Sequence, residues 1–298
     1  MYLPKEYFRY LKEEKKRSPS TLYAYEKDLL QFCASLCRSN MHSSHIDINH
    51  QLLTVNPQTA DDYREELVRR GFCPSSVSRK LTMLRCFYAW LIQIGQLDTN
   101  PFLSTVHRKS PLPPFPYIES EAIQLLFETI HTDTWLGVRD RAMLGLLFNT
   151  GMRVSELLCT QVEDIHWEDA GIYVHGGDRP SRYCILWGWV LDELYHYYQL
   201  RQQTEWACVK QFFVNRNGGP LTSRSIRRKF SAYGRQAGLD VPITPATLRH
   251  SYAMLMLQNG VRPATVKKQL GHLASSSMLP YLDCLEQTHS SCCAETSL

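Results

Sequence analysis

Four prolines within six residues, at positions 111, 113, 114 and 116, are the feature that most constrains how this chain folds. Proline has no backbone N–H and fixes φ, so neither a helix nor the middle of a sheet continues through such a run. An extended, semi-rigid connector is favoured instead. Because 298 residues are enough for two cores of about 150 residues each, the sequence predicts domains at 1–105 and 119–298 joined by a linker at 106–118.

The half before the linker has the pattern of a small all-helical domain. Ser20 is a candidate N-cap for a helix whose apolar residues recur at helical spacing over 22–36. Thr59 opens a second expected helix with a capping-box-like pattern, and Gly71 is expected to stop it. A third helix is expected over 74–95, following a proline and ending at a glycine.

The half after the linker combines helices with one β-hairpin. Segments 171–175 and 182–186 have strand composition and flank a turn-rich stretch, which is typical of a hairpin. Helical patterns cover 120–130, 140–149, 189–204, 223–237, 245–259, 263–270 and 276–287. The predicted fold class is therefore mainly α, with an α+β C-terminal domain that holds a small β-sheet.

Basic residues gather in the N-terminal part and on one expected helix. Residues 1–110 carry 16 Lys and Arg against 11 Asp and Glu, whereas residues 111–298 carry 17 against 18. Arg224, Arg227 and Arg228 fall on one face of the expected helix, opposite its apolar residues. A helix that faces DNA phosphates has this pattern, and so does a solvated basic surface.

Several protein classes are excluded by what the sequence lacks. The ten cysteines are scattered and form no CxxC pair, so neither a zinc site nor a disulfide framework is expected. No apolar stretch approaches the roughly 20 residues of a membrane helix, and residues 1–17 lack the apolar core of a signal peptide. A cytoplasmic protein without a membrane segment is expected.

Four short motifs follow one another in the C-terminal half. They are Thr150–Leu158 (TGMRVSELL), Thr244–Ser251 (TPATLRHS), Gln269–His272 (QLGH) and Tyr281. In order, spacing and wording they resemble the motifs of the tyrosine recombinase family, the phage-integrase and Xer-type site-specific DNA recombinases. A TGxR alone is a weak signal, but four ordered motifs are far more specific than any one of them.

The resemblance covers nearly the whole chain. Ser18, Thr21, Tyr25, Asp28 and Leu29 match the opening of the family's helical core-binding, SAM-like domain. The resemblance implies that the two domains clamp double-stranded DNA between them. It also implies a homo- or hetero-tetramer assembled on two DNA recombination sites, and a reaction that needs neither a metal nor another cofactor.

The resemblance assigns the chemistry to a few side chains. Tyr281 is the expected nucleophile, which cuts a strand through a 3′-phosphotyrosyl intermediate and allows it to be rejoined. Arg153 and Arg249 are the expected forked donors to the scissile phosphate. His272 is expected to donate to a phosphate oxygen or to orient the site. Glu156 either holds Arg153 or is an ordinary helix-surface charge.

Two positions depart from the family pattern. Gly177 stands where the family places a lysine in the β-hairpin, and Ala246 stands where it places the first histidine of its HxxR motif. Arg179 and Arg182, close by in the hairpin, are expected to supply charge and to contact DNA, although a guanidinium releases its proton reluctantly. His250 is expected to be structural, because the family often has a histidine at this position without a primary chemical role. On a helix it also projects about 100° away from the preceding arginine, so it is not expected to replace the missing histidine.

Three functions therefore stay open, and a working site-specific recombinase with relocated proton transfer is favoured. The second is a catalytically impaired relative that binds DNA or supports a partner recombinase, because a general acid or base contributes roughly 100- to 10,000-fold to a rate. The third is a type IB topoisomerase. The motifs do not specify the target sequence, nor whether the role is chromosome-dimer resolution, integration or inversion.

Overall fold

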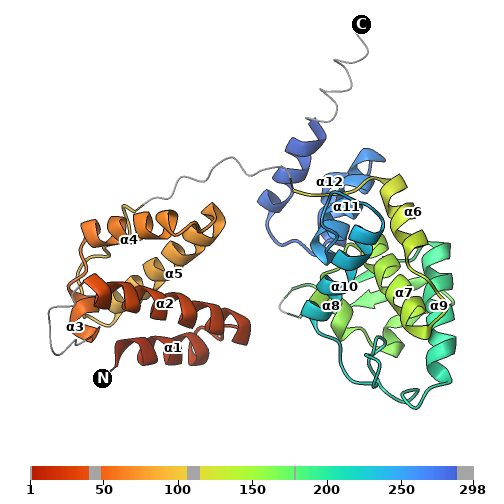
Figure 1. The fold of residues 1–298 in the computed structure, drawn as a ribbon, viewed down its shortest axis with the longest axis horizontal. Coiled ribbons are helices and arrows are strands. Elements are labelled where there is room, and N and C mark those ends of the chain that lie inside the picture. Colours follow the sequence, from red (N-terminus) through yellow and green to blue (C-terminus); the bar gives the residue numbers. More distant parts are fainter. Residues whose placement is uncertain (1, 40–47, 106–114, 178, 287–298) are drawn as a thin grey trace, which may run out of the picture. The chain divides into compact units, whose positions relative to one another are not determined.

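The computed structural model describes residues 2–39, 48–105, 115–177 and 179–286 (Figure 1). The chain divides into two compact units, Met1–Leu112 and Pro113–Leu298. Of the linker predicted at 106–118, residues 106–114 lie outside the described part of the chain. The prediction of a mainly α protein with a small antiparallel sheet is confirmed.

The N-terminal unit is a helical cluster around an aromatic core. Its helices are α1 (Leu3–Glu13), α2 (Pro19–Ser39), α3 (Ile48–Leu53), α4 (Pro57–Arg69) and α5 (Pro74–Gln93). Phe32 of α2 packs edge-on against Tyr63 of α4, at 4.8 Å between ring centroids. The residues of α5 that helical spacing assigned to one face are fully buried: Val77, Leu81, Leu84, Tyr88 and Leu91.

Two helix starts in this unit differ from the sequence prediction. Helix α2 begins at Pro19, so Ser20 lies inside its first turn and is not its N-cap. Helix α4 begins at Pro57, and the side chain of Asn56 caps it by accepting a hydrogen bond from the backbone N–H of Thr59 at 2.9 Å. In both helices proline occupies the first position, where its fixed φ suits the helix and its missing N–H costs nothing.

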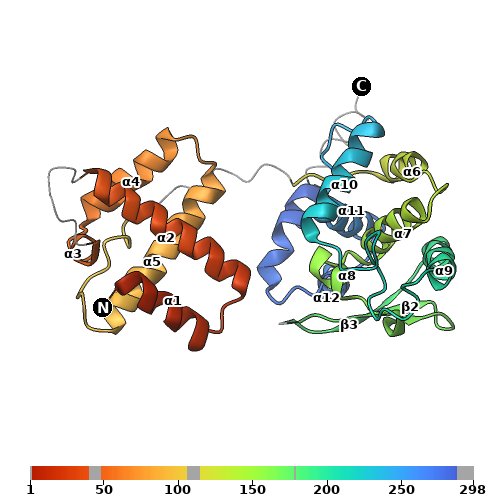
Figure 2. The ribbon, with the colours of Figure 1, turned by 60° about the horizontal axis from the view of Figure 1, so that its bottom comes forward.

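In its described residues the C-terminal unit has seven further α-helices and the sheet. The helices are α6 (Ser120–Thr129), α7 (Trp135–Thr150), α8 (Val154–Cys159), α9 (Gly188–Gln202), α10 (Ser223–Gln236), α11 (Pro245–Gln258) and α12 (Pro263–Gln269). A further helical segment spans residues 279–286. The strands β1 (Ile165–His166), β2 (Gly171–Val174) and β3 (Arg182–Ile185) form an antiparallel sheet in that order, along one edge of the unit (Figure 2).

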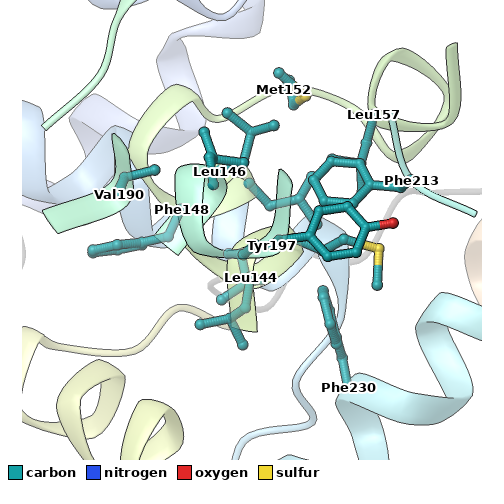
Figure 3. Packing of buried hydrophobic residues seen from close by; sticks show 14 of the residues in the cluster. Leu144, Leu146, Phe148, Met152, Leu157, Val190, Tyr197, Phe213 and Phe230 are labelled. Carbon is teal, nitrogen blue, oxygen red and sulfur yellow. The ribbon is translucent and has the colours of Figure 1, made fainter. Parts of the chain in front are cut away.

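Helix α7 is the centre of the C-terminal core. From Gly137 to Thr150, every residue of this helix except Arg141 is buried. Figure 3 shows Leu146 and Phe148 of α7 among side chains from other helices, including Val190 and Phe230. The helix starts five residues before the predicted position 140, because the Thr134 hydroxyl caps it by accepting from the N–H of Gly137 at 3.2 Å.

Gly151 ends α7, as the sequence predicted, and connects the core to the site described below. It has φ +58°, and a Cβ built there would lie 2.6 Å from Cδ1 of Tyr252 and 2.7 Å from Cδ2 of Leu270. Its carbonyl also accepts a hydrogen bond from Arg249. Position 151 therefore requires glycine both for the left-handed backbone and for the close approach of two buried side chains.

We expect Gly151→Ala to destabilise the protein by about 2–5 kcal/mol in urea unfolding. A left-handed backbone costs a residue with a side chain roughly 1–2 kcal/mol, and overpacking adds roughly 1–3 kcal/mol. Gly260→Ala is the matched control, because Gly260 also has a positive φ of +77° but no atom within 4 Å of its built Cβ. Equal losses in the two variants would contradict a steric role for Gly151.

Candidate active site

The C-terminal unit brings the four predicted catalytic residues together from separate elements. Arg153 precedes α8, Arg249 lies in α11, His272 follows α12, and Tyr281 lies in the 279–286 segment. Both arginines donate to the backbone carbonyl of Leu270, Arg153 through Nη1 at 3.4 Å and Arg249 through Nη2 at 2.6 Å. The rings of His272 and Tyr281 lie 6.5 Å apart between centroids. Residues 128 positions apart in the sequence thus share one small site.

Arg153 is fixed by a short capping motif. It is the N-cap of α8, two residues after the left-handed turn at Gly151. Glu156 accepts a hydrogen bond from its backbone N–H at 2.8 Å and from Nη1 of its guanidinium at 3.1 Å. Glu156, three residues after Arg153, therefore fixes the position of both its backbone and its side chain.

Glu156 is a buried ion-pair partner, with only 7% of its surface exposed, so the alternative of an ordinary surface charge is wrong. Its carboxylate also accepts two hydrogen bonds from the guanidinium of Arg182, at 3.2 and 2.9 Å. Burial alone would raise the pKa of this carboxyl. The hydrogen bonds from Arg182 and from the backbone of Arg153 outweigh burial and lower its pKa.

Arg182 is placed differently from the DNA contact that the sequence predicted. Its side chain is 6% exposed and its guanidinium is occupied by Glu156. Side chains alternate across a strand, and in β3 Arg182 and Cys184 point inward whereas Tyr183 points outward. We therefore interpret Arg182 as a positioning residue for Glu156, since both of its Nη atoms are already bonded to that carboxylate.

Arg249 is buried and held by two backbone carbonyls. Its Nη1 donates to Gly151 at 2.5 Å, and its Nη2 donates to Leu270. Burial, followed by the nearby charge of Arg153, lowers the pKa of Arg249 to about 10. The guanidinium remains charged at neutral pH, and its hydrogen bonds to two carbonyls fix the plane of the guanidinium group before substrate binds.

Tyr281 is buried and hydrogen-bonded, with 4% of its surface exposed. Its hydroxyl lies 2.9 Å from Nδ1 of His250, and the ring of Phe115 lies 4.7 Å from each of these two rings. Burial raises the pKa of the Tyr281 phenol, and the charges of Arg249 and Arg153 oppose that rise. From the sequence, His250 was expected to be structural and not to replace the missing histidine. No local signal showed that Tyr281 would pack on the same side.

His272 has an unsatisfied nitrogen beside the arginines. Its Nδ1 is buried and has no hydrogen-bond partner among the residues that the structure describes. Burial and the charges of Arg249, Arg153 and Arg179 lower the pKa of this imidazole to about 4. His272 is therefore neutral at physiological pH, and a neutral imidazole can still donate one hydrogen bond.

The predicted DNA-contacting arginines other than Arg182 are exposed. On α10, Arg224, Arg227 and Arg228 face solvent, while Ile226 of the same helix is buried in the core. Arg179, in the turn between β2 and β3, is also exposed, and its charge lowers the pKa of both Arg153 and His272. Arg179 therefore adds positive charge to the site itself.

The two positions that depart from the family pattern carry no proton-handling group. Gly177 has φ +61°, and no atom lies within 4 Å of a Cβ built there. Ala246 is exposed in the first turn of α11. The open space at Gly177 can therefore hold a longer side chain.

Two other features bear on the class of protein. Within the described ranges, no cluster of three or more His, Cys, Asp or Glu side chains is arranged to hold a metal ion. In the same part of the chain, no helix is both long and apolar enough to cross a membrane.

Known proteins match both units of the chain. The sequence pattern of the phage integrase family matches residues 116–287, and that of the phage integrase N-terminal SAM-like domain matches residues 5–95. Over 283 residues the chain is 32% identical to tyrosine recombinase XerC of Listeria monocytogenes (serotype 4b, strain F2365), covering 94% of this chain and 92% of the relative. XerC of Staphylococcus carnosus (strain TM300) is 33% identical over 269 residues, covering 90% and 87%.

A solved structure shares the fold. The Tn1549 transposon integrase, in complex with transposon right end DNA, superimposes with a TM-score of 0.74 at 18% identity, over 94% of each chain. At this level of identity the superposition shows a common architecture of the polypeptide.

Proposed function

The chain belongs to the phage integrase family of tyrosine recombinases, and we propose from this membership that Tyr281 is the nucleophile with which it cuts DNA. The protein is a site-specific recombinase, an enzyme that cleaves and rejoins DNA strands. The convergence of Arg153, Arg249 and His272 around the Tyr281 hydroxyl is the observation that carries the assignment of the site.

Cleavage is a transesterification at a phosphodiester. The Tyr281 oxygen attacks the scissile phosphorus and loses its proton, the bond from phosphorus to the 5′ oxygen breaks, and that oxygen takes up a proton. The product is a 3′-phosphotyrosyl ester and a free 5′ hydroxyl. Because the ester keeps the bond energy, a 5′ hydroxyl from another strand can displace Tyr281 without ATP.

The arginines supply the electrostatic part of catalysis. Negative charge develops on the nonbridging oxygens of the phosphate in the transition state, where preorganised donors stabilise it most. Arg249 is preorganised by Gly151 and Leu270, and Arg153 by Glu156. His272, whose Nδ1 has no partner within the described part of the chain, offers a third donor to the same phosphate.

DNA binding rests on the exposed basic residues. We assign phosphate contacts to Arg224, Arg227 and Arg228 on α10 and to Arg179 in the hairpin turn, all of which face solvent. The substrate is a double-stranded DNA recombination site, bound by a homo- or hetero-tetramer that joins two sites. Because the substrate is the DNA of the cell or of a mobile element, we place the enzyme in the cytoplasm.

Covalent capture on a nicked duplex tests this proposal. A binding sequence is first selected from random duplexes. A nick close to the cleavage point then lets the short fragment that carries the new 5′ hydroxyl diffuse away, so that the phosphotyrosyl adduct accumulates. We expect an adduct on denaturing electrophoresis whose DNA-linked peptide contains Tyr281 by mass spectrometry. An adduct on another residue would overturn the assignment, and binding without any adduct would indicate a catalytically impaired relative.

The alternative functions are not favoured by the family and its members. An accessory DNA-binding factor would bind with steep salt dependence and form no adduct. A type IB topoisomerase would relax supercoiled plasmids without preference for a site. The same capture experiment, run beside a plasmid relaxation assay, separates these outcomes.

We expect Gly177→Lys to raise the cleavage rate by about tenfold or more, because a lysine at this position can protonate the leaving 5′ oxygen. The site has open space for the side chain, although the positive φ costs roughly 1–2 kcal/mol of stability. Gly177→Met is the matched control, with a similar length and backbone strain but no proton to donate. Equal rates for the lysine and methionine variants would count against this position as the place of the missing acid.

A further inference from the structure

His250 makes a direct contact with the proposed nucleophile. Its Nδ1 lies 2.9 Å from the Tyr281 hydroxyl, which is hydrogen-bond distance. Elsewhere in the described part of the chain no side chain makes a hydrogen bond to this hydroxyl. The two residues are 31 positions apart and belong to α11 and the 279–286 segment, so packing of the C-terminal unit creates the contact.

An aromatic contact holds the pair in place. The ring of Phe115 lies 4.7 Å from the ring of His250 and 4.7 Å from that of Tyr281. The chain just after Phe115 is tied to α11, because the backbone N–H of Ile118 donates to the hydroxyl of Ser251 at 2.9 Å. Phe115 therefore packs against both partners of the hydrogen bond, and this packing preorganises proton transfer between them.

The other candidate proton acceptors are less well placed. Ala246 has only a methyl group and is exposed. The His272 ring lies 6.5 Å from the Tyr281 ring, and its nearby charges are those of the phosphate-binding arginines. Arg249 and Arg153 are cations and cannot accept a proton. Among the described residues, His250 alone combines an accepting nitrogen with contact to the phenol.

We propose that His250 is the general base of strand cleavage, taking the proton of the Tyr281 hydroxyl through Nδ1. The inference rests on the proposed role of Tyr281 and adds to it the residue that activates the nucleophile. His250 thereby supplies one of the two proton-handling functions that Gly177 and Ala246 lack.

The proton follows a closed path. As the Tyr281 oxygen bonds to phosphorus, its proton moves to Nδ1 of His250, and the departing 5′ oxygen takes a proton from solvent water. On rejoining, the attacking 5′ hydroxyl gives its proton to water, and the His250 imidazolium returns its proton to the Tyr281 oxygen as the phosphotyrosyl bond breaks. No metal, oxidant or reductant enters either step.

The charge state of His250 suits this role. Burial, followed by the adjacent charge of Arg249, lowers the pKa of the imidazole below its ordinary value of 6.5. The charged and titratable groups facing it are Arg249 on its own helix, Tyr281 on the C-terminal segment and His272 in the loop after α12. At neutral pH His250 is therefore neutral and can accept a proton, and acidification through its lowered pKa is expected to remove this capacity.

His250→Asn tests the proposal, because asparagine keeps a hydrogen-bonding atom near the position of Nδ1 but cannot take a proton. We expect cleavage of the nicked duplex to fall about 100- to 10,000-fold, with DNA affinity unchanged. The acidic limb of the wild-type pH–rate profile is expected to disappear in the variant. Free imidazole is expected to restore cleavage partly in His250→Ala. His196→Asn is the matched control, because His196 is exposed on α9.

A second substrate separates the two ends of the proton path. In a duplex with sulfur in place of the bridging 5′ oxygen, the leaving thiolate needs no proton, and a base that acts on Tyr281 is still required. We expect the His250→Asn defect to persist on this duplex. The proposal would be overturned if His250→Asn cleaved the sulfur-containing duplex at the wild-type rate. It would also be overturned if the variant cleaved the normal duplex within threefold of the wild-type rate. Failure of the wild-type protein to form any adduct would instead refute the proposed role of Tyr281.

Discussion

Tyr281→Phe is expected to form no covalent adduct with DNA while binding the same duplex with unchanged affinity. The substitution removes one oxygen, which is the atom that forms the phosphotyrosyl bond, so no residual cleavage by the same route is possible. Adduct formation on the nicked duplex and binding in a gel-shift or anisotropy assay measure the two properties separately. A persistent adduct would show that another residue is the nucleophile.

The same change is expected to have a modest structural cost. The hydroxyl of the buried Tyr281 is the hydrogen-bond partner of Nδ1 of His250, and leaving a buried polar atom unpaired costs roughly 1–3 kcal/mol. Tyr252→Phe is the matched control, because Tyr252 is equally buried and its hydroxyl bonds to Gln269. Tyr252→Phe should lose comparable stability and keep the adduct, which separates chemistry from folding.

Glu156→Ala is expected to destabilise the protein by about 3–5 kcal/mol, the cost of leaving a buried charge without its partner. The carboxylate of Glu156 is bonded to Arg182, whose side chain is 6% exposed, and to Arg153 at the phosphate site. Its removal leaves Arg182 buried and unpaired, and it frees Arg153 to move. Urea unfolding measures the loss, and cleavage under native conditions should fall with it because Arg153 is no longer oriented.

The control for this prediction is an ion pair nearer the surface. Glu193 of α9 pairs with Arg141 of α7 at 2.7 Å, and the arginine side chain is 33% exposed. Because water screens such pairs, Glu193→Ala is expected to cost only about 0–1 kcal/mol. If the two glutamate variants lost the same stability, burial would not be the reason for the effect of Glu156.

The Glu156 contribution also has a defined pH dependence. The pKa of this carboxyl is lowered in the folded protein from its ordinary value of 4.5. A lowered pKa means that the carboxylate stabilises the fold fully above pH 4.5, and that this stability is lost as the pH falls through the folded-state pKa. On acidification, the unfolding free energy of the wild-type protein should therefore fall more steeply than that of Glu156→Ala. The difference in stability between the two proteins should narrow as the pH falls.

Local sequence information predicted most of the architecture. Periodic apolar residues located most of the helices, and a turn-rich stretch between two strand-like segments located the hairpin, since both depend on residues close in sequence. The errors lie at helix starts such as α2, where Pro19 and not Ser20 begins the helix. The short strand β1 and the short helices α3 and α8 were not expected, because two to six residues are too few to show a period. Helix α1, of 11 residues, was not expected either.

The residue types of the active site could also be read from the sequence. Arg153, Arg249, His272 and Tyr281 stand in motifs whose order identified the family, and phosphate chemistry explains why forked cations and a phenol are needed. The motifs alone did not indicate which atoms these side chains contact.

The tertiary structure decided which of the neighbouring side chains join them. Arg182 was expected at the DNA surface, but the alternation of β3 turns it inward onto Glu156. His250 was expected to be structural, but the packing of residues 279–286 against α11 brings the Tyr281 hydroxyl to its Nδ1.

The proline run between the two units shows the same division between local chemistry and tertiary packing. Its backbone chemistry alone forbids a helix at 111–116, yet only the folded unit places Phe115 against both His250 and Tyr281. Sequence by itself thus determined the elements, the family and the types of catalytic group, because these depend on local spacing. The contacts that activate Tyr281 depend on segments more than 30 residues apart, whose meeting is set by core packing and not by any local pattern.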